Sequence, residues 1–195
     1  MKRNRMHMEV PELLIRKCLK NDRRAHNELY KLLFGYLMSI CMRYQKNYDD
    51  AGAAVNAIFL KIVLGLSDFD GGRPFLPWVK TIAIRHLIDE HRKTTARNER
   101  IVFDDEQIED EGYTSLPSTE IEAKDLLIMV KSLPETTAKV FNLHVMDGYK
   151  HNEIGEMLNL SEGTSRWHLS IARKQLQALL IVESKKLDHN KTISA

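Results

Sequence analysis

The chain has 195 residues, of which 43% are hydrophobic and 29% charged, with a net charge of +2, as in many soluble proteins of one or two domains. No apolar run approaches the roughly 20 residues that span a bilayer, and the basic start, MKRNRMHMEVPELLIRK, lacks the apolar core of a secretory signal. The two cysteines, Cys18 and Cys41, form no CxxC pair. We therefore expect a cytoplasmic protein with buried free thiols.

The charge is distributed unevenly along the chain. Between Thr94 and Glu120 there are eight acidic and two basic residues, so this stretch has a net charge of −6 and the rest of the chain carries +8. Two basic parts of the chain on either side of an acidic segment would favour partners that carry phosphates.

Helical periodicity dominates the first half of the sequence. Apolar residues recur at spacings of three and four from Asn27 to Tyr44 and from Ala51 to Leu66. Two glycines and a proline in SDFDGGRP then interrupt the pattern, and another helix follows from about Phe75 to Lys93. A shorter amphipathic segment over residues 8–20 precedes these helices.

The second half begins with a polar, acidic and aperiodic stretch over residues 94–118, which we expect to be a flexible linker. Helices resume at STEIEAKDLLIMVKSL, where Thr119 and Glu122 fit a capping box. Pro134 fits the first turn of the next helix, which we expect to reach about Met146.

The sequence therefore predicts an all-α protein, since no alternation of useful length indicates strands. Two small helical domains are expected, over residues 8–93 and 119–182, joined by the acidic linker. The last helix is expected to fray near Ser184.

The stretch HNEIGEMLNLSEGTSRWHLSIARKQL, residues 151–176, indicates two helices with a short turn between them. Asn159 tolerates the left-handed backbone that such a turn often needs, and Ser161 is a good N-cap for the second helix. This chemistry is typical of a helix-turn-helix, whose second helix enters the DNA major groove. The inward positions of that helix are Ser165, Leu169, Ala172 and Leu176, and the outward ones are Arg166, Trp167, Ser170 and Ile171, with His168, Arg173 and Lys174 nearby.

Motifs for catalysis and cofactor binding do not occur in the sequence. There is no GxxxxGK[ST] or GxGxxG phosphate-binding motif. His86 and His91 are five residues apart, about 140° around a helix, so they cannot share a metal as the two histidines of HExxH do. His144 and His151 likewise have no ligand partners at useful spacing. We therefore predict no enzymatic activity, no cofactor and no metal site.

Residues 133–177 resemble the C-terminal domain of extracytoplasmic-function sigma factors, a group within the sigma-70 family of RNA polymerase sigma factors. Gly155 stands where the family pattern, Glu-Ile-Ala, has alanine. The matching positions are Leu133-Pro134, Phe141 and Leu143, Asp147-Gly148-Tyr149, Glu153-Ile154, Leu158, Ser161-Glu162-Gly163-Thr164 and Ala172-Arg173.

Three segments of the first half resemble the N-terminal domain of the same family, in the same order. NDRRAHNELYKLLFGYLMSI is similar to its first conserved helix, and DDAGAAVNAIFLKIV to its polymerase-binding helix. FLPWVKTIAIRHLIDEHRK is similar to its promoter-melting helix. Together the resemblance covers about 150 residues.

The resemblance implies a sigma factor that directs core RNA polymerase to specific promoters in a stress or envelope response. The implied partners are the clamp helices and flap of the polymerase, promoter DNA, and an anti-sigma factor that could hold the chain at the inner membrane. The free protein would be a monomer. The implied contacts are Arg166, Trp167, Ser170, Ile171, Arg173 and Lys174 for the −35 element, Trp78, Lys80, Arg85, Arg92 and Lys93 for the −10 element, and Asp49, Asp50, Asn56 and Phe59 for core polymerase.

The polymerase-binding helix departs from the family pattern, which has Asp-Ala-Glu-Asp and then Gln-Glu. Here Asp50–Ala53 and Asn56–Ala57 occupy these positions, so three usual acids are missing. Each lost charge-assisted contact would be worth about 1.5–3 kcal/mol if well formed. Apolar contact through Ile58, Phe59 and Ile62 could compensate, unless these residues are core. The alternative function is a helix-turn-helix DNA-binding regulator that does not dock productively on the polymerase.

The DNA-binding helices also depart from the pattern. Arg85 replaces a usual asparagine and suits phosphate or guanine. Trp78 is either a stacking group for DNA or a core residue. Trp167 stands where a small residue is usual, and Ile171 where arginine is frequent. These changes indicate an altered −35 preference, or weaker DNA binding if Trp167 turns inward.

Overall fold

The computed structural model describes the backbone of residues 10–98 and 123–193, and the side chains of residues 10–93 and 125–182. Within these ranges every regular element is helical, which confirms the predicted all-α fold. The chain forms two compact units, Met1–Arg97 and Asn98–Ala195, called unit 1 and unit 2 below. None of the described helices is long and apolar enough to cross a membrane.

Most of the expected linker, residues 94–118, and the expected capping box of Thr119 and Glu122 lie outside the described residues. The first linker residues are an exception, because the last helix of unit 1 continues through them to Asn98.

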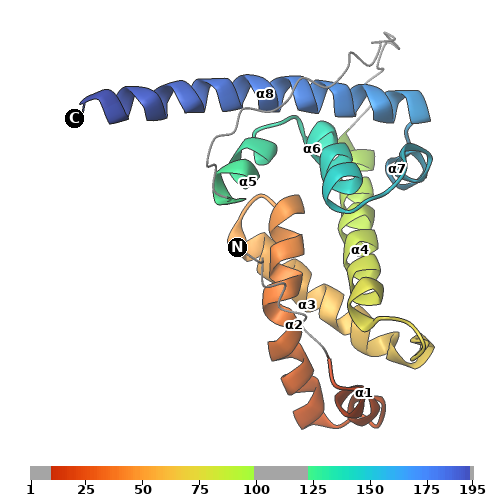
Figure 1. The fold of residues 1–195 in the computed structure, drawn as a ribbon. Coiled ribbons are helices and arrows are strands. Elements are labelled where there is room, and N and C mark those ends of the chain that lie inside the picture. Colours follow the sequence, from red (N-terminus) through yellow and green to blue (C-terminus); the bar gives the residue numbers. More distant parts are fainter. Residues whose placement is uncertain (1–9, 99–122, 194–195) are drawn as a thin grey trace. The chain divides into compact units, whose positions relative to one another are not determined.

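The described part of unit 1 consists of α-helices and one 3-10 turn (Figure 1). These are α1 (Glu12–Leu19), α2 (Arg23–Tyr44), α3 (Tyr48–Leu64), the 3-10 turn η1 (Leu66–Asp68) and α4 (Phe75–Asn98).

Side-chain caps start α2 and α3 earlier than the apolar periodicity indicated. The Asp22 carboxylate accepts hydrogen bonds from the backbone N–H groups of Arg24 (2.8 Å) and Ala25 (3.2 Å), so α2 begins at Arg23. The Asn47 side chain accepts from the backbone N–H of Asp50 (2.8 Å), so α3 begins at Tyr48. A polar residue that caps a helix lies outside the apolar stripe, and the stripe therefore marks helix starts too late.

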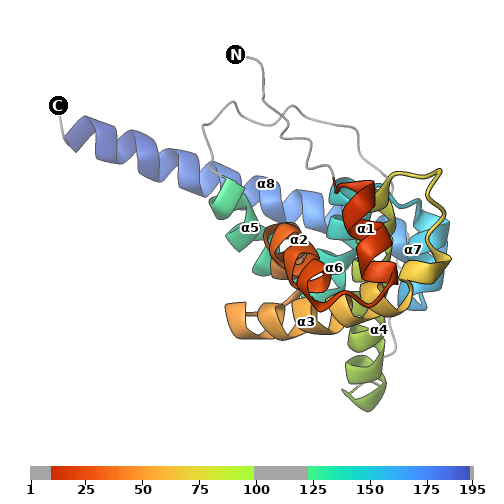
Figure 2. The same cartoon turned by 90° about the horizontal axis from the view of Figure 1, so that it is seen from below.

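The core of unit 1 is formed mainly by α2, α3 and α4, and Figures 1 and 2 both show α2 beside α3. Cys18 and Cys41 are buried free thiols, as predicted, and burial raises the pKa of Cys41 to about 12. The fully buried side chains are Leu29, Leu33 and Leu37 of α2, Val55, Ile58 and Ile62 of α3, and Val79 and Ile84 of α4.

Unit 2 packs short helices against one long helix. Its apolar interior is formed by the side chains of Leu133, Val140, Leu143, Ile154, Leu169 and Leu176. Its elements are α5 (Ala123–Lys131), α6 (Glu135–Phe141), the π turn η2 (Asn142–Met146), α7 (His151–Leu158) and α8 (Glu162–Ile193).

Helix α8 runs to Ile193, so the expectation that it frays near Ser184 is wrong. After Gly163 the helix contains neither glycine nor proline, and nothing in its local sequence stops it. The polar composition of this segment indicated a frayed helix end. Polar residues do not by themselves break a helix, however, and α8 continues through them.

Candidate nucleic-acid interface

The helix-turn-helix of unit 2 is built by α7, a short turn and the start of α8. At the start of α7 the backbone N–H of Lys150 donates to the Glu153 carboxylate at 2.7 Å. Asn159 ends α7 with φ 59° and ψ 48°, the left-handed conformation that its side chain type predicted. The Leu160 N–H then donates back to the Gly155 carbonyl at 2.9 Å.

The second helix begins as predicted at a serine cap. The Ser161 hydroxyl accepts from the backbone N–H of Thr164 at 2.9 Å. Burial of the four predicted inward residues is also confirmed, since Ser165, Leu169, Ala172 and Leu176 are all at most 6% exposed. The inward face of the first turns of α8 therefore contains the four residues that the periodicity indicated.

His168 was expected near the outer face, and this expectation is wrong. Its ring is only 3% exposed, and its Nδ1 lies 3.0 Å from the Thr137 hydroxyl of α6. The buried stripe of α8 is wide because α6 and α7 both pack against it. Trp167 remains half-buried with its ring edge-on to His168, so it has not turned fully into the core.

The residues assigned to the −35 element follow one another along the first turns of α8. Arg166 forms an ion pair with Glu162, one turn earlier. Arg166 and Lys174 are exposed, while Trp167, Ser170, Ile171 and Arg173 are half-buried.

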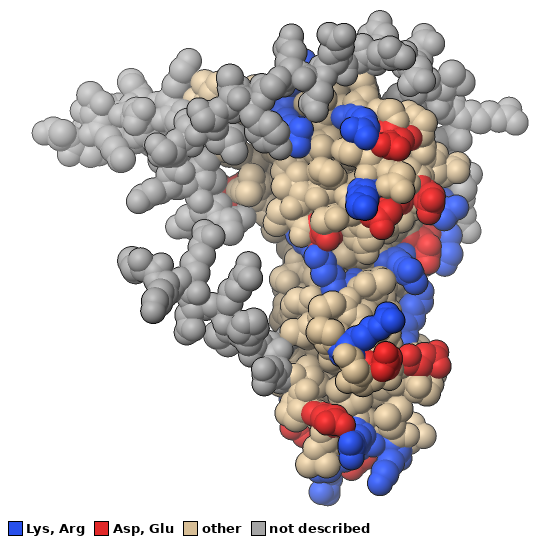
Figure 3. Space-filling view, turned by 45° about the vertical axis from the view of Figure 1, so that its right-hand side comes forward, with Lys and Arg blue, Asp and Glu red and all other residues tan. Residues whose placement is uncertain are grey.

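The residues that follow the acidic stretch do not form a strongly basic domain, contrary to expectation. Residues 121–195 carry ten basic and nine acidic side chains, whereas residues 1–93 carry 17 basic and ten acidic ones. On the face seen in Figure 3, lysine and arginine are interspersed with acidic residues. The charge of residues 121–195 is therefore nearly balanced.

A histidine pair beside the helix-turn-helix was missed by sequence reasoning. The rings of His144 and His151 stack with centroids 4.4 Å apart. Burial, followed by the charges of His144 and Arg166, lowers the pKa of His151. Among the described residues no group of three or more histidine, cysteine or acidic side chains is arranged to hold a metal ion. The sequence does not show that the two histidines meet, because this depends on the path of the turn between them.

The residues assigned to the −10 element lie on α4. Arg85, Arg92 and Lys93 are exposed, Lys80 is half-buried, and Lys93 forms an ion pair with Glu90 at 2.8 Å. Cations seven residues apart, such as Arg85 and Arg92, lie on one side of a helix.

Trp78 is half-buried in an aromatic cluster at the start of α4. Its ring lies 5.1 Å from that of Phe69 and 5.5 Å from that of Phe75, and these two rings meet edge-on at 5.1 Å. The cluster joins both ends of the loop between η1 and α4. Trp78 therefore packs within the protein while part of it remains accessible.

The residues assigned to polymerase binding lie along α3. Asp49 and Asp50 are in its first turn, and Asp50 also accepts from the Asn47 side chain at 2.9 Å. Asn56 accepts from the Tyr30 hydroxyl at 2.8 Å, and Phe59 meets the Tyr30 ring edge-on at 5.0 Å.

The apolar residues suggested to compensate for the missing acids are mostly core. Ile58 and Ile62 are completely buried, so they cannot make that contact. Leu60 and Leu64, at 59% and 72% exposed, are the leucines of α3 that face outward.

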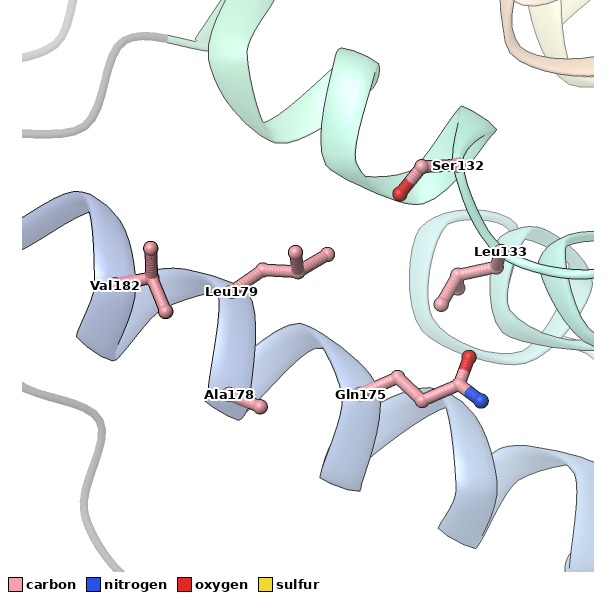
Figure 4. Close-up of a pocket in the computed structure, with 6 residues that line it drawn as sticks. All are labelled: Ser132, Leu133, Gln175, Ala178, Leu179 and Val182. Carbon is pink, nitrogen blue, oxygen red and sulfur yellow. The ribbon is translucent and has the colours of Figure 1, made fainter.

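Unit 2 also contains an apolar pocket of about 350 Å³ between the end of α5 and α8 (Figure 4). It begins on α8 after the residues assigned to DNA. Its lining residues are Ser132, Leu133, Gln175, Ala178, Leu179 and Val182.

Acid should destabilise the fold before any carboxylate is protonated. Burial is the first cause that lowers the pKa values of His86, His151 and His168 from the ordinary value of 6.5. The unfolded chain therefore binds protons first as the pH falls. We expect the unfolding free energy to be fully present above about pH 6.5 and to decrease below it. Urea unfolding at several pH values measures this, and His168→Met should reduce the slope; an unchanged slope would contradict the assignment.

Comparison with known proteins identifies both units. The family model "Sigma-70 region 2" matches residues 29–97, and "Sigma-70, region 4" matches residues 124–176, so together they cover more than half of the chain.

Curated relatives match over nearly their whole length. The ECF RNA polymerase sigma factor SigW of Bacillus subtilis is 25% identical over 87% of this chain and 98% of that protein. The ECF RNA polymerase sigma-E factor of Haemophilus influenzae is 23% identical over 85% and 93%. The sigma factor RpoE, solved in complex with the anti-sigma factor NepR from Bartonella quintana, has the same fold, with a TM-score of 0.50 at 20% identity over 80% of this chain and 96% of that chain. The chain therefore belongs to the extracytoplasmic-function group of the sigma-70 family of RNA polymerase sigma factors.

Proposed function

We propose that this chain directs core RNA polymerase to specific promoters, in a stress or envelope response. The main observation in its support is that one chain combines a region 2 unit with a region 4 unit. The helix-turn-helix of the region 4 unit has a capped second helix and a left-handed residue in its turn. Sigma factors are not a class of enzymes, and no step of the proposal needs a catalytic group.

Unit 2 would read the −35 element through α8. Arg166, Trp167, Ser170 and Ile171 would meet base edges in the major groove, while Arg173 and Lys174 would meet phosphates. The small basic excess of residues 121–195 supports recognition by single, well-placed side chains rather than by general electrostatic attraction.

Unit 1 would bind the −10 element through α4 and the loop before it. Arg85, Arg92 and Lys93 would contact phosphates, with Lys80 on the same helix. A flipped non-template base would enter near the Asp68–Pro74 loop, and stacking there would repay an unstacking cost of a few kcal/mol. The aromatic cluster around Trp78 supports this placement, because it fixes both ends of the loop.

Further partners follow from the same proposal. Asp49, Asp50, Asn56 and Phe59 on α3 would meet the polymerase clamp, and the apolar pocket of unit 2 offers a surface for the flap. An anti-sigma factor would bind the chain when it is inactive, as NepR binds RpoE in the solved complex. The free chain would be a monomer in the bacterial cytoplasm.

Replacing Arg166 with alanine should relax the promoter preference at one position of the −35 element. A bidentate contact between arginine and guanine discriminates by about 1–3 kcal/mol. Binding to a set of −35 duplexes, each with one base pair changed, measures the effect. Lys174→Ala is the matched control and should weaken binding to all duplexes alike, and a uniform loss with Arg166→Ala would make Arg166 a phosphate contact.

Run-off transcription with purified core polymerase and genomic promoter fragments tests the proposed function. Specific initiation that depends on the added chain is the expected result. The second candidate, a DNA-binding regulator that does not dock productively, is favoured by the missing acids at Gly52, Ala53 and Ala57. It predicts footprints without polymerase and no initiation from the same fragments.

A further inference from the structure

Two histidines face each other beside the helix-turn-helix of unit 2. His144 lies in the π turn and His151 is the first residue of α7. Their half-buried rings stack at 4.4 Å between centroids, with 17° between the ring planes. A charge on one ring opposes a charge on the other at this distance, so a proton on His151 is sensitive to what surrounds the two rings.

Hydrogen bonds hold both rings by their Nδ1 atoms. His144 Nδ1 donates to the Tyr149 carbonyl oxygen at 2.9 Å, because a carbonyl can only accept. His151 Nδ1 lies 2.9 Å from the Oγ of Ser165, a completely buried residue of α8. The hydroxyl can donate to a neutral ring or accept from a protonated one. Protonation can therefore change the charge of the pair while both rings stay in place.

The charges around His151 come from the π turn and from the recognition helix. His144 faces it from η2, and from α8 Arg166 and Arg173 oppose a proton on its ring while Glu162 favours one. On α7 itself, Glu153 accepts from the Lys150 backbone. In the free protein, burial and then the charges of His144 and of two arginines assigned to DNA thus oppose a proton on His151. DNA phosphates beside these arginines would offset their charges and remove this opposition.

We propose that His151, stacked on His144, takes up a proton when unit 2 binds the −35 element, so that promoter affinity rises as the pH falls. This inference rests on the proposed promoter-reading function. Binding and protonation are reciprocal, since DNA that raises the proton affinity of His151 is itself bound more tightly by the protonated chain. One linked proton allows at most about a tenfold gain in affinity for each pH unit.

The test uses the full chain and a short duplex that the chain selects from a randomised pool at about pH 7.5. We expect the dissociation constant to fall by about three- to tenfold between about pH 7.5 and about pH 6 at constant ionic strength. The double variant His144→Gln/His151→Asn keeps polar groups at both sites but cannot titrate there, and its affinity should stay nearly constant. His26→Gln, a change of a half-buried histidine in unit 1, is the matched control and should keep the wild-type response.

Equal tightening of the wild type and the double variant would overturn the inference, as would a wild type that binds its duplex equally at both pH values. A chain that selects no duplex at either pH instead overturns the proposed function, and this inference with it. Calorimetry in buffers of different ionisation enthalpy counts the protons directly and needs no folded variant. Uptake of a fraction of a proton by the wild type on binding supports the inference, and no uptake near about pH 6.5 overturns it.

Discussion

Replacing Gly155 with alanine should destabilise unit 2 by about 1–3 kcal/mol, although alanine is the better helix former. A Cβ atom at Gly155 would lie 2.7 Å from the carbonyl oxygen of Leu160, which is a backbone atom and cannot rotate away. The turn that carries Leu160 is fixed by the left-handed Asn159 and by the Leu160 N–H bond to Gly155. The expected gain in helix propensity, about 1 kcal/mol, is smaller than the cost of opening this turn.

Two other glycines provide matched controls for this prediction. A Cβ at Gly163 would lie 3.6 Å from the Ser161 hydroxyl, an ordinary contact, and a Cβ at Gly52 would meet nothing within 4 Å. Gly163→Ala should therefore leave unit 2 as stable or up to about 1 kcal/mol more stable, and Gly52→Ala should stabilise unit 1 by a similar amount. Chemical unfolding of the three variants measures the differences. A Gly155→Ala chain as stable as Gly163→Ala would show that the turn opens freely.

The contrast between these glycines shows what the sequence could and could not supply. Resemblance placed Gly155 where the family pattern has alanine, and the structure buries it on α7. Neither reveals how closely the following turn approaches, because that distance depends on the backbone path through Asn159. The consequence of the departure is therefore a property of the fold.

Much of the helix-turn-helix was predictable because its signals are local. The cap at Ser161, the left-handed Asn159 and the apolar spacing of α8 each act within a few residues. His168 was wrongly expected near the outer face of α8. An apolar stripe with spacings of three and four shows which residues are buried when a helix packs against a single partner. Two partners, α6 and α7, widen the buried face of α8, and only the tertiary structure shows this.

On α3 the sequence left open whether Ile58 and Ile62 are contact residues or core, and their burial shows that they are core. Ile58 and Ile62 continue the inward stripe and are core, whereas Leu60 and Leu64 face outward at the same spacing of four. The apolar stripe of the sequence contained Ile58 and Ile62 but not Leu60 and Leu64. The polymerase-binding helix is thus poorer in acids than the family pattern, and Leu60 and Leu64 are exposed on it.

The double variant Leu60→Gln/Leu64→Gln should weaken binding to core polymerase by about a hundredfold. Full burial of a leucine stabilises by about 1.5–3 kcal/mol, and partial loss at two positions amounts to about 3 kcal/mol. Glutamine is nearly as good a helix former as leucine, so α3 should remain folded. Wild-type binding should also change little with salt, because apolar burial is not screened as ion pairs are. Titration of labelled chain with core polymerase at low and high salt measures both effects.

Leu13→Gln/Leu19→Gln is the matched control, since these leucines of α1 belong to the same unit and are 64% and 48% exposed. That variant should bind core polymerase as the wild type does. Equal losses in the two double variants would indicate a general effect of removing exposed leucines. Wild-type affinity in the Leu60→Gln/Leu64→Gln chain, with steep salt dependence, would instead assign docking to Asp49 and Asp50. Loss of binding confined to the α3 variant would mean that the missing acids changed the chemistry of polymerase docking from charge pairing to apolar burial.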